Sequence, residues 1–180
     1  MENSNNNIKD IEAITRQVRS KIIDMAHKAR CAHLASALSC VDILATLYWE
    51  VLKIDPKNPK DPMRDRFILS KGHGAMALYS TLAYKGFFSK DLLNTFGDNG
   101  TILAEHPDPV LPGVEVATGS LGHGLSVGIG MALAGRIQKK NYRVYILLSD
   151  GECNEGSIWE AAMFAPSHKL ENVIAIIDFN

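Results

Sequence analysis

The sequence predicts an α/β fold in which helices flank a parallel β-sheet. Two continuous apolar runs, 144–148 and 173–177, are typical of strands covered on both faces of a sheet. A segment with helical spacing separates them, and strand–helix–strand units of this kind place the two strands parallel. A third apolar run, 66–70, adds another strand. The 180 residues correspond to the length of about one domain.

The chain before the first strand is predicted to be helical. Apolar residues recur with helical spacing from Ile11 onward, which predicts a helix over 10–29. Ser39 is expected to cap a second helix, with Asp42 in its first turn. The expected buried face of that helix is Val41, Leu44, Leu47, Tyr48 and Val51. Three prolines within 55–62 exclude a helix there and predict a surface connection.

Shorter elements are expected between the first two strands. A helix should follow residue 74, and a short helix capped by Ser89 should come next. Residues 97–113 are rich in Gly and Pro, which predicts a loop. A glycine-rich run, 118–124, then leads into a helix. One face of that helix carries Gly124, Gly128, Ala132 and Gly135, and glycine disfavours a helix enough that close packing is the expected reason.

The helix between the last two strands is expected to begin near Gly156. Its inward residues are predicted to be Trp159, Ala162 and Ala165. Pro166 cannot donate a backbone hydrogen bond, so a break or kink is predicted near Ala165.

Composition excludes several classes of protein. The 19 basic and 20 acidic residues give a net charge of −1, which argues against a nucleic-acid footprint. The sequence contains no continuous run of about 18 apolar residues, so no membrane span is predicted. The Asn-rich start has no signal-peptide pattern, so residues 1–10 are expected to be a disordered tail and 11–180 the domain. The three cysteines form no CxxC pair, as expected for reduced thiols in the cytoplasm.

Polar residues follow both of the clearest strands. Asp150 and Asn180 stand at strand ends, where open α/β sheets bind ligands. Their oxygen atoms suit Mg²⁺ or Ca²⁺ together with phosphate oxygens. Gly151 allows a sharp turn, and the following helix N-terminus favours a diphosphate.

A dinucleotide site is the alternative from the same class of fold. Gly122, Gly124 and Gly128 open a helix, and Asp150 follows about 20 residues later, where a ribose-binding acid belongs. That arrangement would indicate an NAD(P)-dependent oxidoreductase. The segment before the glycines is a weak strand, and Asn180 stays unexplained by this alternative.

Several segments, taken in order, resemble the transketolase family. Residues 149–161 (SDGECNEGSIWEA), closing at Asn180, resemble its thiamine diphosphate motif. The other matching segments are 65–73 (DRFILSKGH), His106-Pro107, 112–115 (PGVE), 118–124 (TGSLGHG) and the region from His33 to Leu44. The resemblance spans roughly 11–180 and is strongest to split transketolases, in which a separate chain supplies the pyrimidine-binding half.

The resemblance implies a cofactor site for thiamine diphosphate with Mg²⁺ or Ca²⁺. Asp150 and Asn180 would hold the metal ion. Gly151 would contact the diphosphate, and His73 would lie near it. The remaining contacts, with the aminopyrimidine, would come from Gly119 and Leu121.

The resemblance also implies how the chain would act. His33, His73 and His106 would line the donor-sugar channel and handle hydroxyl protons, while Glu155 would lie at the subunit interface and couple to the carboxylate that activates the pyrimidine. His123 replaces a residue that is often glutamine in the family.

The implied reaction transfers a two-carbon ketol group from a ketose phosphate to an aldose phosphate. The expected assembly is a heterotetramer or dimer with a pyrimidine-binding subunit, and the domain is expected to be incomplete at its C-terminal side. A non-catalytic subunit that keeps the fold is a further alternative. Departures at Ala32, Leu34, Ala35 and Glu105 lie near the implied sugar channel and put the substrate in question.

Overall fold

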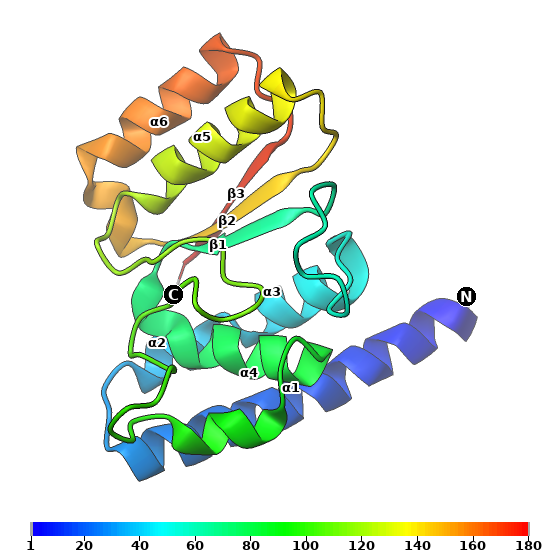
Figure 1. Ribbon diagram of the computed structural model, residues 1–180, viewed down its shortest axis with the longest axis vertical. Coiled ribbons are helices and arrows are strands. Elements are labelled where there is room, and N and C mark those ends of the chain that lie inside the picture. The colour runs from blue at the N-terminus through cyan, green and yellow to red at the C-terminus, as the bar shows by residue number, and fades with distance from the viewer. Residues whose placement is uncertain (1, 180) are drawn as a thin grey trace. The chain divides into compact units, whose positions relative to one another are not determined.

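The computed structural model describes residues 2–179, which form two compact units. The helical unit comprises Met1–Leu52 and His73–Glu105, and the sheet unit comprises Lys53–Gly72 and His106–Asn180. Elements of both units are labelled in Figure 1.

The helical unit is built around α4 (Ala75–Lys85). Nine consecutive residues of α4, from Ala75 to Ala83, are buried, so this helix is apolar on nearly every side. It packs against α1 (Glu2–Ala29), α2 (Leu34–Ser39) and α3 (Val41–Thr46). Two short helices complete the unit, the π-helical turn η1 (Leu47–Val51) and the 3₁₀ helix η3 (Lys90–Thr95).

Helix α1 confirms the predicted apolar face but begins earlier than expected. Val18, Ile22 and Met25 are buried at the predicted spacing. The helix starts at Glu2 rather than at residue 10. No Pro or Gly interrupts residues 2–10, so nothing in the local sequence ends the helix there.

The prediction that Ser39 caps the second helix is wrong. Ser39 is the last residue of α2, and its hydroxyl donates to the Ser36 carbonyl at 3.1 Å. A serine near a helix end can bond back to the preceding turn in this way. Cys40 occupies the N-cap of α3 without a side-chain hydrogen bond. The Ser89 cap is confirmed, because its hydroxyl accepts from the Asp91 amide at 3.2 Å.

One window in the helical unit has the length and hydropathy of a membrane span. It runs over Leu34–Val51, and 39% of it is buried inside the structure. In the structure it is divided among α2, α3 and η1, and Ala37, Val41 and Leu44 lie in the core. Buried core helices pass the same test, so the window is weak evidence for a span.

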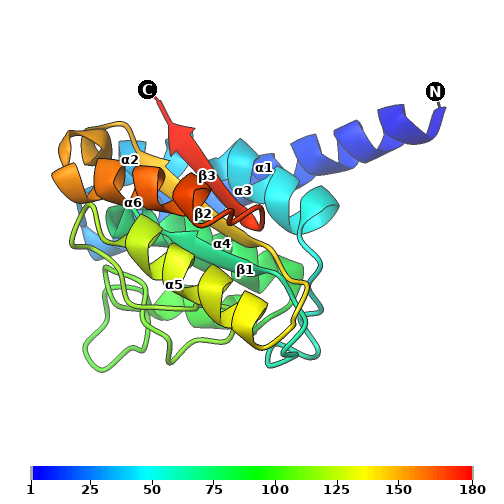
Figure 2. The same ribbon diagram turned by 90° about the horizontal axis from the view of Figure 1, so that it is seen from above.

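The sheet unit contains three parallel strands in the order β1-β2-β3. They are β1 (Arg66–Leu69), β2 (Val144–Ser149) and β3 (Val173–Asp178), which confirms all three predicted strands. Helices α5 (Gly124–Ile137) and α6 (Gly156–Ser167) lie on the same face of the sheet (Figure 2). A 3₁₀ turn, η4 (Gly151–Asn154), follows β2 directly.

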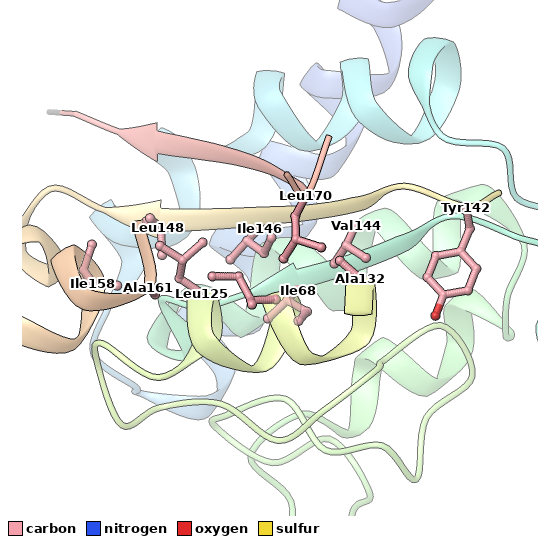
Figure 3. Packing of buried hydrophobic residues seen from close by; sticks show 11 residues of the cluster. Ile68, Leu125, Ala132, Tyr142, Val144, Ile146, Leu148, Ile158, Ala161 and Leu170 are labelled. Atoms are coloured by element: carbon pink, nitrogen blue, oxygen red, sulfur yellow. The ribbon is translucent and has the colours of Figure 1, made fainter. Parts of the chain in front are cut away.

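The core of the sheet unit lies between the strands and these two helices. Side chains of Val144, Ile146 and Leu148 from β2 meet Leu125 from α5 and Ile158 from α6 (Figure 3). Every residue of β2 is buried, as its continuous apolar run predicts.

Strand β3 is less covered than predicted. Ala175 and Ile177 are exposed, and the burial pattern alternates along part of the strand. Among the described residues β3 pairs only with β2, so it forms an edge of this sheet.

Glycines of α5 allow close packing, as was expected from the helix propensity that they sacrifice. A Cβ atom on Gly128 would lie 2.6 Å from Ile146 Cγ1, and one on Gly135 would lie 2.8 Å from the Tyr142 ring. These contacts require the helix backbone to approach the sheet closely. Only glycine allows that distance.

The predicted inward face of α6 is confirmed at Ala165, which packs against the core, but it is wrong at the other two positions. Trp159 is 59% exposed and Ala162 is exposed, whereas Ile158 and Ala161 are buried. The helix is apolar on several sides, so its periodicity does not identify one face. The predicted break near Ala165 is also absent, because Pro166 lies in the last turn and the helix continues to Ser167.

Candidate functional site

The carboxyl edge of the sheet places Asp150 beside β3. Asp150 directly follows β2, and its amide donates to the Asp178 carbonyl at 3.2 Å. Its side chain is half-buried. Asn180, the second predicted metal ligand, lies outside the described residues. Strands β2 and β3 are adjacent and parallel, so the chain leaves both of them at the same edge.

The donor set at this edge suits a cation that is also bound by phosphate. Residues 2–179 contain no cluster of three or more His, Cys, Asp or Glu side chains arranged for a metal ion. The one predicted ligand among the described residues, the Asp150 carboxylate, leaves most coordination positions for phosphate oxygens and water. Mg²⁺ is commonly held in this way.

The glycine-rich loop 118–124 packs closely on the same unit. A Cβ atom on Gly72 would lie 2.7 Å from the Thr118 carbonyl, so the loop runs against the end of β1. Gly119 has a φ of +142° and lies against the ring of His106. Two predicted site residues, Gly119 and His106, are therefore brought together. His106 itself is exposed.

A cavity of about 340 Å³ opens beside this loop. Thr118, Ser120 and His123 contribute to its wall. Within the described part of the chain, the Thr118 hydroxyl oxygen is buried and has no hydrogen-bond partner. A buried polar atom without a partner is costly, so an additional polar group fits here. Leu121, the other predicted cofactor contact, is half-buried in the loop.

Glu152 is a functional candidate that the sequence analysis missed. It is completely buried in η4, two residues after Asp150. Its carboxylate accepts from the Ser70 hydroxyl, from the Gly122 amide at 3.1 Å and from the Ser149 amide at 2.9 Å. A glutamate in a polar, glycine-containing turn has the sequence signature of a solvated residue, so no local signal reveals its burial.

Glu155 lies on the surface next to the same loop. It is exposed and precedes α6. A Cβ atom on Gly122, whose φ is +86°, would lie 2.8 Å from Glu155 Cβ. The Ser157 hydroxyl donates to the Gly122 carbonyl at 2.8 Å. Glu155 therefore lies against the loop with its carboxylate accessible.

A buried ion pair links the ends of two strands. Lys71 Nζ lies 2.6 Å from Asp178 Oδ2, and both side chains are at least nine-tenths buried. Lys71 follows β1 and Asp178 ends β3, on either side of β2. Sequence reasoning did not find this pair, because its members are 107 residues apart.

The helical unit holds the other two predicted histidines. The ring centroids of His33 and His73 are 5.2 Å apart. His33 has a φ of +69° and begins α2, while His73 lies in the 3₁₀ turn η2 (Gly72–Gly74). Cys31 and Glu105 line the same small cavity, and burial raises the pKa of the Cys31 thiol.

The comparison with known proteins assigns the family. The transketolase, thiamine diphosphate binding domain family matches residues 11–180. The chain belongs to the transketolase family. A solved transketolase from Leishmania mexicana superposes with a TM-score of 0.87 at 31% identity, covering 94% of this chain and 27% of that one.

Two similar relatives are named as components of transketolases. One, from Phocaeicola vulgatus, is a subunit of an apulose-4-phosphate transketolase; it is 46% identical over 173 residues, covering 96% of this chain and 62% of the relative. The other, from a Clostridium species, is a subunit of a 6-deoxy-6-sulfo-D-fructose transketolase; it is 43% identical over 172 residues, covering 95% and 62%. The chain thus spans about three fifths of the length of these relatives.

The transketolase assignment also removes the dinucleotide alternative. In that alternative the glycines at 122 and 124 must directly follow a strand. In the structure, residues 97–123 form turns and loop, so no described strand leads directly into these glycines. The cost of glycine in α5 is explained instead by its packing on β2.

Proposed function

We propose that this chain is the thiamine diphosphate-binding subunit of a split transketolase. The reaction would transfer a two-carbon ketol group from a ketose phosphate to an aldose phosphate. The observation that carries this proposal is the strand-end Asp150, in the same turn as Glu152, whose carboxylate bonds the glycine-rich loop at Gly122, in a chain that belongs to the transketolase family.

When bound, thiamine diphosphate supplies the electron sink that this carbon–carbon chemistry needs. Asp150 and Asn180 would hold Mg²⁺ or Ca²⁺ against the diphosphate, and Gly151 would contact the diphosphate through its backbone. Gly119 and Leu121 would orient the aminopyrimidine.

The chain's histidines would move protons on the sugar hydroxyls. Imidazole exchanges protons readily near neutral pH, which suits the roles proposed for His33, His73 and His106. The 5.2 Å separation of the His33 and His73 rings supports a joint role for these two residues.

The substrate need not be that of either relative. Glu105 lines the cavity that contains His33 and His73, and so does Ala32. Both positions depart from the family pattern. A carboxylate beside the two histidines would favour sugars that present hydroxyl groups there and disfavour an anionic group.

The proposed enzyme also requires a partner chain that binds the pyrimidine end of the cofactor. The relatives are named as subunits, which supports a separate pyrimidine-binding chain in a heterotetramer or dimer. The exposed Glu155 would contact that partner and couple to its pyrimidine-activating carboxylate. The assembly would be cytoplasmic, because the three cysteines form no CxxC pair and no even disulfide framework.

Titration calorimetry tests the cofactor site. The full-length protein with its partner should bind thiamine diphosphate only when Mg²⁺ or Ca²⁺ is present, and Asp150→Ala should abolish this binding. If Asp150→Ala binds as the parent does, the site assignment is wrong.

A ketol-transfer assay on the reconstituted complex tests the reaction. Product formation supports a catalytic role. Cofactor binding without any transfer, across a panel of ketose and aldose phosphates, would favour the alternative of a non-catalytic subunit.

A further inference from the structure

Three segments of the sheet unit converge on one buried carboxylate. Glu152 accepts hydrogen bonds from the Ser70 hydroxyl after β1, the Gly122 amide in the glycine-rich loop and the Ser149 amide at the end of β2. Glu152 is 0% exposed, so water does not replace these donors. The Ser149 hydroxyl in turn accepts from the Glu152 amide at 3.2 Å, which fixes the turn that carries the carboxylate.

We propose that Glu152 is a positioning residue that anchors the glycine-rich loop 118–124 to the carboxyl ends of β1 and β2. This inference rests on the proposed function, because the loop would supply the aminopyrimidine contacts of Gly119 and Leu121. The anchor acts through Gly122, whose amide bonds to Glu152 and whose carbonyl accepts from Ser157. Glu152 would therefore act on the cofactor contacts indirectly, through the position of the loop.

The geometry explains why the anchor is a carboxylate. All three partners of Glu152 are donors, and a carboxylate offers acceptor sites only. Oε1 receives the Ser70 and Gly122 hydrogen bonds, and Oε2 receives the Ser149 bond. Glu152→Gln keeps Oε1 as an acceptor for the loop but turns an NH₂ donor toward the Ser149 amide. Glu152→Ala removes every acceptor and leaves the three donors without partners.

The chain offers a matched control at the other end of the same strands. Asp65 is 3% exposed, and its carboxylate accepts from the Lys53 amide at 2.9 Å and the Arg143 amide at 2.8 Å. Asp65 directly precedes β1 and bonds Arg143, directly before β2, as Glu152 bonds segments just after these strands. Asp65→Ala therefore breaks a comparable buried carboxylate network without touching the loop.

Hydrogen exchange of the ligand-free full-length protein tests the anchor directly. Glu152→Ala should raise exchange in 118–124 by about tenfold or more, and Glu152→Gln should restore most of the protection. Asp65→Ala should raise exchange near residues 53 and 143 and leave 118–124 at the parent rate. Unchanged exchange of the loop in Glu152→Ala, or equal effects of both alanine variants on it, would overturn the proposal.

Calorimetry with thiamine diphosphate and Mg²⁺, in the presence of the partner, gives the functional readout. We expect affinity to fall about tenfold or more in Glu152→Ala, to recover in Glu152→Gln, and to stay within about twofold of the parent in Asp65→Ala. If the parent binds and Glu152→Ala binds equally well, the positioning role is wrong. If the parent itself does not bind thiamine diphosphate, the proposed function is wrong. The hydrogen exchange result would still show whether Glu152 anchors the loop.

A third variant covers the case in which Glu152→Ala does not fold. Ser70→Ala removes one donor and keeps the carboxylate bonded to Gly122 and Ser149. It should raise exchange of the loop by about two- to fivefold, since the carboxylate loses one of the groups that hold it in place. Loop exchange at the parent rate in Ser70→Ala would contradict the anchor, because one of the hydrogen bonds that hold the carboxylate has been removed.

Discussion

Two of the buried carboxylates of the sheet unit, Asp178 and Glu152, are held by different groups. Asp178 is paired with the Lys71 ammonium, whereas Glu152 is held by a hydroxyl and two backbone amides. Burial of a charge is costly unless hydrogen bonds or an opposite charge replace water. The two carboxylates therefore respond differently when a partner is removed.

Removing the lysine of the buried ion pair should destabilise the protein strongly. Lys71→Met leaves Asp178 buried beside an apolar side chain, and such a loss costs about 3–5 kcal/mol. The double variant Lys71→Met/Asp178→Leu should recover part of this loss, because no charge stays buried. Urea unfolding measures both. A double variant less stable than Lys71→Met would contradict the account.

Reaction of Cys31 should depend on pH in a defined direction. Burial raises the pKa of this thiol, with the nearby Glu105 carboxylate acting in the same direction. Since the thiolate is the nucleophile, iodoacetamide should alkylate Cys31 more slowly in the folded protein than in the urea-unfolded protein at pH 8. The difference between the two rates should become smaller as the pH rises. A Cys40→Ala/Cys153→Ala background isolates the signal. Equal rates at pH 8 would contradict the raised pKa.

At the level of single elements, α5 depends on glycine at particular positions. Gly128 faces β2 and Gly130 faces open space, although both lie in the same helix. On the face toward the sheet, the close packing requires a residue without a side chain. On the other face, glycine only lowers the helix propensity. The two positions therefore separate packing from propensity.

Alanine at these two glycines should change stability in opposite directions. Gly128→Ala places Cβ against Ile146 in the core and should destabilise by about 1–3 kcal/mol. Gly130→Ala meets no atom within 4 Å and should stabilise by about 0.5–1 kcal/mol. Thermal or urea unfolding gives both signs. Stabilisation by both variants would show that α5 does not need its close approach to β2.

Helix α6 shows where sequence periodicity stops being informative. Its exposed Trp159 donates a hydrogen bond to the Cys153 carbonyl at 2.7 Å, so the indole is fixed outside the core. The helix carries apolar residues on several sides, and packing against α5 and the sheet selected Ile158 and Ala161. The prediction of Trp159 as a core residue failed for this reason.

For the molecule as a whole, a ligand of the folded state should raise thermal stability. With the partner present, thiamine diphosphate at about 100 times its Kd should add about 2.7 kcal/mol, provided Mg²⁺ is present. Scanning fluorimetry should show a concentration-dependent rise in Tm that a chelator removes. The Asp150→Ala variant should show no rise, and a rise of equal size in that variant would contradict the metal-bridged site.

Local patterns in the chain were enough to predict the three strands and most helices, and ordered motifs that resemble the transketolase family were enough to predict the family. Continuous apolar runs and ordered motifs are properties of neighbouring residues, so they are readable without the fold. Only the tertiary structure shows that Ile158 of α6 points inward and that Lys71 pairs with Asp178. These outcomes depend on contacts between distant segments. The burial of Glu152 belongs to the same class, because its three donors come from segments that are brought together only in the folded chain.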